Sequence, residues 1–310
     1  MRSPLKQLAR RVLAPIVDRL DTLRAEIEHN RMLIVQPRIR EFRAGATLNR
    51  LADAEFRVFS QWGEDGIIQY LLARVPITHC AFVEFGVENY RESNTRFLLM
   101  NDNWRGLVID ADPHAIAQIQ AQEYMWRHDL TTVCAFVTRE NINRLLADAG
   151  FSGDLGLLSI DLDGNDYWVW QAIDVASPRI VVIEYNSLFG AHRAVTVPYD
   201  SRFRRGAAHA SHLYFGASLK ALCLLAADRG YVFVGSNSAG NNAFFVRSDV
   251  AGGLPALSAE EGYVESRMRE SRDARGRLSF VSGAARRALI ADMPVLDVET
   301  STMLRVGELP

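Results

Sequence analysis

Between Phe59 and Arg247 the chain alternates short apolar runs with segments whose apolar residues recur at helical spacing. The apolar runs are nearly continuous, which is typical of strands buried on both faces of a sheet. This alternation predicts an α/β fold with a mostly parallel, seven-stranded sheet and helices on both of its faces. The expected strands are 81–86, 106–110, 133–137, 155–160, 180–183, 231–234 and 243–246.

The helices expected between these strands carry their own start and stop signals. Pro113 stands at a favoured first helical position, and Thr138 is expected to cap a helix that ends at Gly150. The longest helical run, 213–228, is stopped by Gly230. The last two strands follow as a hairpin, which adds one antiparallel strand to the sheet.

Changes in residue pattern divide the chain into three parts. Residues 1–45 are expected to form an N-terminal amphipathic helix, 55–250 the α/β domain, and 251–310 a C-terminal extension. In the extension, helical pieces are expected at 260–275 and 283–290, with their arginines on a solvated face.

The N-terminal part carries apolar residues at spacings of three and four: Leu13, Ile16, Leu20, Leu23 and Ile27. This short heptad pattern is open to three interpretations. The helix packs on its own domain, it forms a homo-oligomer, or it lies at a membrane surface, because Arg2, Lys6, Arg10 and Arg11 precede it. Pro37 is expected to end the helix.

The overall charge and the cysteines exclude several classes of protein. The formal net charge is −2, which gives no electrostatic basis for binding nucleic acid. Cys80, Cys134 and Cys223 are odd in number and lie in apolar surroundings, so we expect reduced core cysteines in a cytoplasmic protein. No apolar run approaches the roughly 20 residues that a membrane-spanning helix needs.

An acidic cluster follows the expected strand 155–160. Asp161, Asp163 and Asp166 lie within six positions, together with Asn165. A calcium-binding EF-hand loop is excluded, because its sixth position requires glycine and its twelfth a glutamate, which is Ala172 here. We expect the first two carboxylates to face a ligand, and the residues at 165 and 166 to cap the next helix.

Acidic residues also lie at the ends of three other expected strands, at Glu84, Asp110 and Glu184. Ligands of parallel sheets bind at the carboxyl ends of the strands. The loop after Gly86 lacks the glycines of a dinucleotide-binding loop, and a pyrophosphate would be repelled there. S-adenosylmethionine fits this polarity, since it carries an ammonium and a sulfonium, and the carboxylate at position 110 could accept its ribose hydroxyls.

Four motifs resemble those of FkbM-type methyltransferases. They are Phe59-Ser60-Gln61-Trp62-Gly63-Glu64-Asp65-Gly66, Phe82-Val83-Glu84-Phe85-Gly86 with Ser93-Asn94-Thr95, Trp104-Arg105-Gly106-Leu107-Val108-Ile109-Asp110, and Ser159-Ile160-Asp161-Leu162-Asp163-Gly164. The chain departs from the family pattern at 165–168, at 184–186, and throughout 189–218.

The resemblance implies a Rossmann-like class I methyltransferase fold with S-adenosylmethionine as the methyl donor. It implies O-methyl transfer to a hydroxyl of a sugar, glycan or natural product, as in polysaccharide or natural-product biosynthesis. The positions expected to contact the donor are Gln61, Glu84, Gly86, Asn94, Asp110, Ala111, Thr138 and Asp161.

Methyl transfer to a hydroxyl needs a base or a metal ion, because a neutral hydroxyl is a poor nucleophile. The candidate catalytic residues are Asp163, Glu184 and His192, the last in the loop after the fifth strand. Alternatively, Asp161, Glu184 and Asn186 supply oxygen ligands that would suit Mg²⁺.

Two other functions remain open from the sequence. One is a non-catalytic partner protein that keeps the methyltransferase fold, and the other is a glycosyl or phosphoryl transferase whose acidic strand ends hold a metal–nucleotide. The arginine-rich loop 198–205 is expected to form a lid over a small-molecule or glycan acceptor.

Overall fold

The computed structural model describes the backbone of residues 4–310 and the side chains of residues 13–17 and 19–310. The chain forms two compact units, Met1–Ala46 and Thr47–Pro310. Across the described helices, none is both long and apolar enough to cross a lipid bilayer.

The first unit is built on one helix, α1 (Pro4–Arg43), with Pro15 and Pro37 inside it. The expectation that Pro37 ends this helix is wrong. An internal proline forfeits its own backbone hydrogen bond and costs about 3 kcal/mol, which the surrounding helix-forming residues can offset. The basic residues expected at a membrane surface, Arg2, Lys6, Arg10 and Arg11, have side chains outside the described residues.

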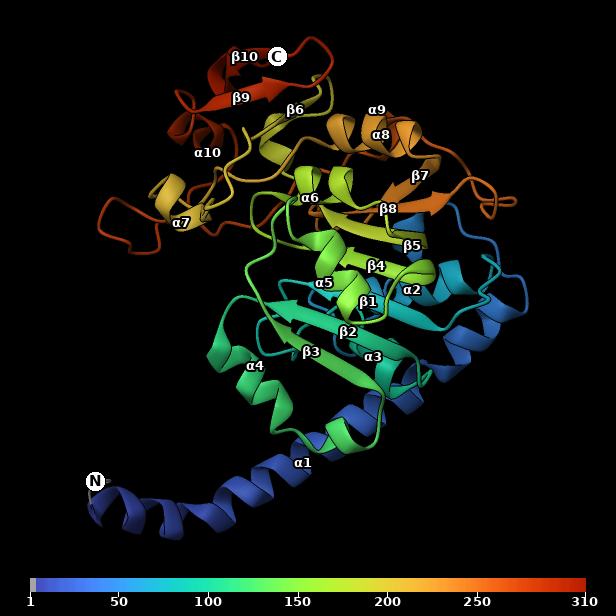
Figure 1. Cartoon of the computed structure of the whole chain (residues 1–310), viewed down its shortest axis with the longest axis vertical. Helices are drawn as coiled ribbons and strands as arrows, with labels where there is room; N and C mark the ends of the chain where they lie inside the picture. Colours follow the sequence, from blue (N-terminus) through green and yellow to red (C-terminus); the bar gives the residue numbers. More distant parts are fainter. Residues whose placement is uncertain (1–3) are drawn as a thin grey trace. The chain divides into compact units, whose positions relative to one another are not determined.

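The second unit contains a seven-stranded sheet with the strand order β3-β2-β1-β4-β5-β8-β7 (Figure 1). The first five strands along the chain are parallel, and β8 is antiparallel to both of its neighbours. The predicted fold class is therefore confirmed. The strands are β1 (Ala81–Phe85), β2 (Arg105–Asp110), β3 (Leu130–Cys134), β4 (Gly153–Ile160), β5 (Ala176–Glu184), β7 (Tyr231–Ser236) and β8 (Asn242–Arg247).

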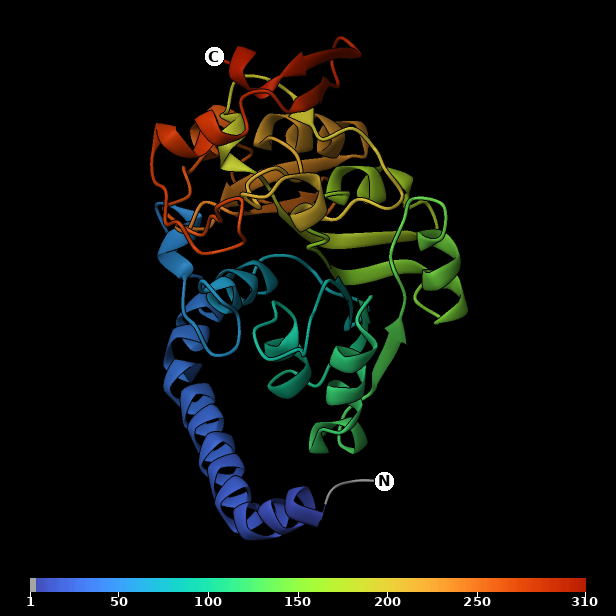
Figure 2. The ribbon, with the colours of Figure 1, turned by 90° about the vertical axis from the view of Figure 1, so that its left-hand side faces the viewer.

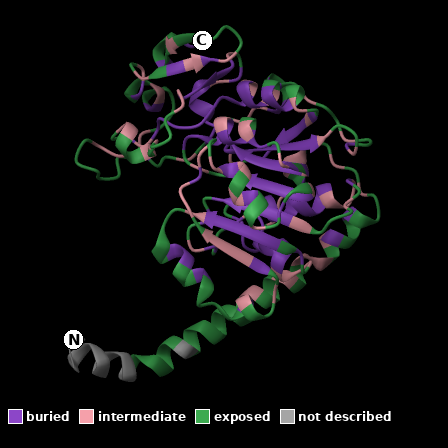
Figure 3. Cartoon of the chain, in the orientation of Figure 1, coloured by how far each residue is buried: buried purple, intermediate pink, exposed green. Residues whose placement is uncertain are grey.

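Helices cover both faces of this sheet (Figure 2). Val83 and Phe85 of β1 share one core with side chains of α5, α6 and α8, whereas Glu84 points to the opposite face, toward the start of α3. Figure 3 shows the strands as the most deeply buried part of the unit. The helices are α2 (Glu64–Leu72), α3 (Arg96–Met100), α4 (Pro113–Gln120), α5 (Ile142–Asp148), α6 (Asp166–Ala172), α7 (Arg205–Ala208), α8 (Leu219–Asp228), α9 (Ala259–Gly262) and α10 (Ala284–Leu289).

Several element boundaries differ from the sequence expectations. The helix expected over 213–228 begins only at Leu219, because Ser218 caps it by accepting a hydrogen bond from the backbone N–H of Ala221. Thr138 does not cap α5, since Asn141 occupies the capping position. Strand β3 lies three residues earlier than expected, which leaves 135–137 free to line a cleft.

A second, three-stranded sheet was not anticipated. Its strands are β6 (Val195–Thr196), β9 (Pro294–Asp297) and β10 (Thr302–Arg305), with β9 in the centre. The segment after β5 and the C-terminal segment thus pair directly and share a small apolar core. The helix expected over 260–275 is wrong, because only Ala259–Gly262 is helical there and 263–283 is irregular.

The cysteines are free, but two of the three are not core residues. Cys80 and Cys134 are exposed, and Cys223 is half-buried. The apolar neighbours in the sequence misled the prediction, because Cys80 precedes β1 and Cys134 ends the edge strand β3, where the backbone leaves the core.

Candidate functional site

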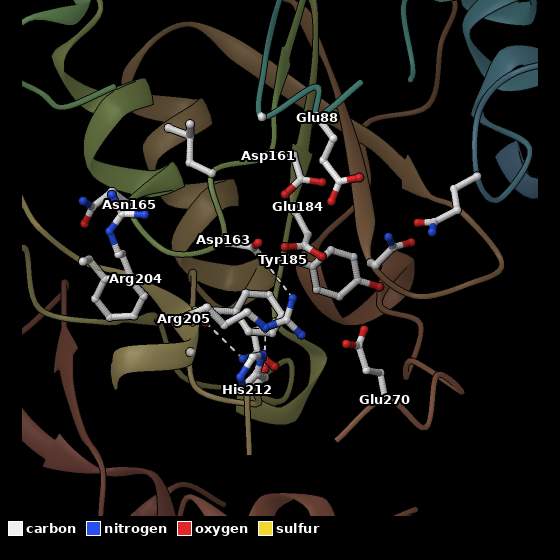
Figure 4. Close-up of a pocket in the computed structure, with 18 of the residues that line it drawn as sticks. Glu88, Asp161, Asp163, Asn165, Glu184, Tyr185, Arg204, Arg205, His212 and Glu270 are labelled. Carbon is white, nitrogen blue, oxygen red and sulfur yellow. Dashed lines mark hydrogen bonds and ion pairs between the residues drawn. The ribbon is translucent and has the colours of Figure 1, made fainter. Parts of the chain in front are cut away.

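A cleft of about 790 Å³ opens at the carboxyl ends of β1, β2, β4 and β5. Its inner wall is formed by these strand ends and the loops that follow them, and its outer wall by 203–212, 266–270 and α10. Figure 4 shows acidic side chains of the inner wall facing Arg205 and His212 of the outer wall. The two walls come from segments far apart in the sequence.

The loop before α2 brings Gln61 and Trp62 into this cleft. Asp65 holds the loop in place: its Oδ2 accepts hydrogen bonds from the backbone N–H groups of Val58, Phe59 and Ser60, at 2.7 to 2.9 Å. Burial raises the pKa of Asp65 to about 6, although these hydrogen bonds act in the opposite direction. Asp65 therefore has a structural role, and Gln61 and Trp62 line the cleft.

Glu84 does not line the cleft, contrary to its expected role as a donor contact. Its carboxylate accepts hydrogen bonds from the backbone N–H groups of Asn94 (2.9 Å) and Thr95 (3.1 Å), and from the hydroxyls of Ser93 and Thr95. Asn94 donates instead to the Ser159 hydroxyl at 3.1 Å, and it also lies off the cleft. These residues tie β1 to the start of α3 rather than contact a ligand.

Gly86 is required where β1 and β4 approach each other at the cleft floor. Its φ is +70°, and a Cβ there would lie 1.7 Å from the backbone carbonyl oxygen of Asp161. Any side chain would force the two strand ends apart. The glycine therefore sets the spacing between the loop after β1 and the acidic residues after β4.

Asp110 and Ala111 line the cleft at the end of β2. The Asp110 carboxylate accepts hydrogen bonds from the backbone N–H of Glu88 at 2.7 Å and from that of Asp112 at 2.8 Å. Each carboxylate oxygen has further lone pairs, so the oriented group can still accept hydroxyl hydrogens from a ligand. The side chain is thus held in place for binding.

Three carboxylates meet at the centre of the inner wall. Asp161, Asp163 and Glu184 each place an oxygen so that the three atoms lie within 4.8 Å of one another. Glu184 is 7% exposed, and its Oε2 has no hydrogen-bond partner among the described residues. A buried carboxylate oxygen without a partner is costly unless a cation or a donor completes its shell.

The electrostatics of this acidic cluster follow from burial and mutual repulsion. Asp161 is open to the cleft on one side, but burial by the surrounding protein raises the pKa of its carboxyl well above the ordinary value. Repulsion by the carboxylates of Asp163 and Asp166 raises this pKa further. Burial and the carboxylates of Asp161 and Asp163 likewise raise the pKa of Glu184. Asp161 and Glu184 thus bind protons more tightly than ordinary carboxyls, and a metal ion bound beside them would compete with these protons.

Arg205 is the cation that faces the acidic cluster from the outer wall. Its Nη1 lies 2.7 Å from Oδ1 of Asp163, and its guanidinium stacks 4.0 Å from the centre of the Phe215 ring. Burial works against its charge, but Glu184 and Asp163 raise its pKa overall. The arginine partly neutralises the acidic cluster and leaves the Glu184 oxygen unpaired.

Three other expected site residues have structural roles or lie off the cleft. Asn186 lines the cleft, but hydrogen bonds hold its amide: it accepts from the backbone N–H of Leu188 and donates to two carbonyl groups, all at 3.0 Å. Thr138 does not line the cleft and donates its backbone N–H to Asn141. His192 lies outside the cleft, where its ring is exposed beside Glu260 at 3.5 Å.

The residues expected to cap α6 have different roles. Asp166 accepts hydrogen bonds from the backbone N–H groups of Leu162 (2.8 Å) and Gly164 (3.0 Å), and thereby shapes the loop that carries Asp163. Asn165 occupies the capping position without a capping hydrogen bond, and donates to the carbonyl oxygen of Asp200 instead. Both side chains stabilise the loop between β4 and α6 rather than capping α6.

The outer wall contains Arg204 and Arg205, which belong to the arginine-rich loop expected to form a lid, and His212, a histidine of the segment after β5 that was also a candidate from the sequence. It also contains Arg269, Glu270 and Arg286, which the sequence did not assign to a site. Arg269 and Arg286 come from the C-terminal extension, whose pairing with the segment after β5 has no local sequence signature.

No protein-family model matches the chain, and no curated protein matches it. Among solved structures, precorrin-6y C5,15-methyltransferase from Geobacter metallireducens is 14% identical, with a TM-score of 0.35 over 62% of this chain and 90% of its own. The N-terminal domain of EvdMO1 with SAH bound is 9% identical, with a TM-score of 0.39 over 68% of this chain and 93% of its own.

Phosphoethanolamine N-methyltransferase 2 from Haemonchus contortus, in complex with S-adenosyl-L-methionine, is 14% identical, with a TM-score of 0.34. The match covers 55% of this chain and 37% of that one. At these TM-scores the likenesses add nothing to the fold and the cleft described above, and the function is argued from the cleft itself.

Proposed function

We propose that the protein is an S-adenosylmethionine-dependent methyltransferase. The observation that carries this proposal is the cleft at the carboxyl ends of β1, β2 and β4, where Gly86, Asp110 and Asp161 converge. Open parallel sheets bind their ligands at this edge. The inner wall is acidic and lacks a glycine-rich phosphate-binding loop, which suits a ligand with cationic groups and a ribose.

Asp110 is the residue suited to the ribose of the donor, since two backbone N–H groups orient its carboxylate at the cleft surface. Gln61 and Trp62 at the rim offer an amide and an aromatic face beside it. The sulfonium and the ammonium of the donor would be balanced by the acidic residues after β4, of which Asp161 is the nearest to Gly86.

The acceptor we propose is a hydroxyl of a sugar, glycan or natural product, bound against the outer wall. The hydroxyl oxygen forms a bond to the methyl carbon while the carbon–sulfur bond breaks, and the sulfur keeps that electron pair as a thioether. The hydroxyl proton passes to a carboxylate, for which Asp163 is the candidate because it lies between the two walls, opposite Arg205. Arg204 and Arg269 on the outer wall suit an acceptor that also carries an anionic group.

A second form of this mechanism uses a divalent cation. The observation that favours it is the acidic cluster with the unpartnered Glu184 oxygen. Asp161, Asp163 and Glu184 would hold the ion, and Asn186 lines the same cleft with its amide held by hydrogen bonds. When bound, such an ion acidifies the acceptor hydroxyl.

Donor binding is the experiment that tests the proposal. Calorimetric titration with S-adenosylmethionine and S-adenosylhomocysteine should show saturable binding, and each ligand should raise the melting temperature. We expect Asp110→Asn to weaken donor binding about 10-fold, because one charged hydrogen-bond acceptor is lost. The matched control is Asp129→Asn, which alters an exposed acid on the surface beside Arg105, 3.5 Å away.

The other functions that the sequence left open predict different results. A non-catalytic partner protein would bind neither donor nor product, and that outcome overturns the proposal. A glycosyl or phosphoryl transferase would be stabilised by a nucleotide sugar with Mn²⁺ and not by S-adenosylmethionine. For the divalent-cation form, full turnover in excess chelator would exclude a metal requirement and leave the carboxylate base.

A further inference from the structure

The helix α1 carries a continuous apolar seam that extends beyond Ile27. Its positions follow a strict alternation of three and four: Leu13, Ile16, Leu20, Leu23, Ile27, Asn30 and Ile34. The six apolar side chains are between 42% and 75% exposed. Figure 3 shows the same helix as exposed along this stretch.

A seam of three heptads with this spacing is the pattern of a coiled coil. In heptad terms, Leu13, Leu20, Ile27 and Ile34 occupy the a positions, and the remaining three seam residues the d positions. Pro15 falls at an outward c position, so the proline does not enter the seam. The apolar area of one helix would be covered by the same area of another.

We propose that α1 forms a parallel, in-register coiled-coil dimer with α1 of a second copy of this chain. Asn30 selects the orientation. In a parallel pair it faces Asn30 of the other copy, where the two amides can hydrogen-bond. In an antiparallel pair a d position faces an a position, and every a position here is apolar, which would bury the amide without a partner.

The flanking charges support the same arrangement. Glu26 at a g position would face Arg31 at an e position of the second copy, which is attractive in the parallel register. Arg19 would approach Arg24 of the second copy. This repulsion is reduced because Arg24 pairs with Glu28 of its own helix at 3.1 Å.

The charge on the outward face argues against a membrane surface as the occupant. Helices that lie on anionic membranes carry a polar face rich in lysine and arginine. Between Leu13 and Ile34 there are three arginines and four acidic residues, so this stretch is not cationic. A second copy of the chain therefore fits the seam better than a lipid surface does.

Sedimentation equilibrium of the full-length chain tests the proposal. We expect a concentration-dependent dimer, and at least a 100-fold higher dissociation constant for the double variant Leu20→Glu/Leu23→Glu. The matched control is Ala14→Glu/Ala25→Glu, which adds the same charge at exposed positions outside the seam and should change the constant less than twofold. The seam side chains are exposed, so the melting temperature of the second unit should stay unchanged in both variants.

Disulfide trapping tests the orientation. In a Cys80→Ser/Cys134→Ser background, Asn30→Cys should be oxidised rapidly to a covalent dimer, and the outward-facing Ala25→Cys should not. A dimer in which Asn30→Cys fails to cross-link would overturn the parallel register. A monomer at all concentrations, or a dimer unaffected by Leu20→Glu/Leu23→Glu, would overturn the interface. Binding of the monomer to vesicles with 30% phosphatidylserine through the same residues would assign the seam to a membrane instead.

Discussion

The two walls of the cleft differ in charge and in origin. The inner wall consists of consecutive strand ends and collects carboxylates at Asp110, Asp161 and Glu184, whereas the outer wall brings arginines from an insertion and from the C-terminal tail. The two walls meet in one short ion pair, between Asp163 and Arg205. Under the proposed function, the inner wall would receive the cationic donor and the outer wall the acceptor.

The walls also differ in how their charges are compensated. On the inner wall, burial and mutual repulsion raise the pKa values of Asp161 and Glu184, which favours a cationic neighbour. On the outer wall, the arginines that line the cleft outnumber the acidic Glu270, and burial lowers the pKa of Arg286. The two walls thus differ in charge, and each can be altered separately.

The largest effect on donor affinity and stability is expected from Gly86→Ala, which changes the inner wall alone. A methyl group 1.7 Å from the backbone oxygen of Asp161 would push β1 and β4 apart. We expect donor affinity to fall at least 100-fold and the free energy of unfolding to fall by about 2 to 3 kcal/mol. Calorimetry and urea unfolding measure the two quantities.

The matched control is Gly230→Ala, since Gly230 has a similar φ of +77° but a Cβ there would meet no atom within 4 Å. Its cost should be about 1 kcal/mol, with donor affinity unchanged. Equal losses in the two variants would show that backbone strain, and not the close approach of the strands, requires glycine at position 86.

The next effect is the pH dependence of stability in Glu184→Gln. A carboxyl whose pKa is raised by folding binds protons more tightly in the folded state, so stability falls as pH rises from about 4.5 through the raised value. Glutamine does not ionise, so the variant lacks this loss of stability at high pH. We expect the variant to be more stable than the native chain at pH 8 and no more stable at pH 4, with a slope difference of up to about 1.4 kcal/mol per pH unit.

The measurement is urea unfolding between pH 4 and pH 8, with and without Mg²⁺. If a divalent cation binds the acidic cluster, Mg²⁺ should stabilise the native chain at pH 8 and leave Glu184→Gln unaffected. Identical pH profiles for the two chains would contradict the raised pKa of Glu184.

The inner wall could largely be predicted from the sequence, because its determinants are local. An apolar run followed by an acid places the acid at the end of a strand, and parallel strands bring such ends to one edge. The error at Glu84 has a physical reason: the side chains of a strand alternate between faces, so this carboxylate points away from the core shared by Val83 and Phe85. It accepts hydrogen bonds from the backbone N–H groups at the start of α3 instead of binding a ligand.

Apart from the arginine-rich loop 198–205, the outer wall could not be predicted, because it depends on contacts between distant segments. The pairing of β6 with β9 joins residues about 100 positions apart, and neither strand exceeds four residues. The arginines of the tail looked like those of a solvated helix, but Arg269 lies in an irregular segment and donates to the carbonyl oxygen of Phe280. Only the folded chain shows that Arg269 and Arg286 reach the cleft.

A smaller effect is expected from Arg205→Gln, which removes the cation that links the two walls. Because Asp163 is largely exposed, solvent weakens the ion pair, and we expect a loss of about 1 kcal/mol at pH 8. The loss should be smaller at pH 5 than at pH 8, because the raised pKa values of Asp161 and Glu184 favour their neutral forms as the pH falls, and neutral carboxyls need less compensation. Arg204→Gln is the control, since Arg204 stacks on Phe136 and should show no such difference between the two pH values.

The smallest effect separates two histidines of the outer region. His212 lines the cleft and its ring lies against Gly206 beside Arg205, whereas His192 is exposed outside the cleft and its backbone oxygen accepts a hydrogen bond from Lys220. We expect His192→Ala to leave methyl transfer unchanged within twofold, and His212→Ala to slow it about 3- to 10-fold, because the outer wall loses packing next to Arg205. Steady-state rates with a common acceptor measure both. A large loss in His192→Ala alone would place the base in the loop after β5 and remove Asp163 from that role.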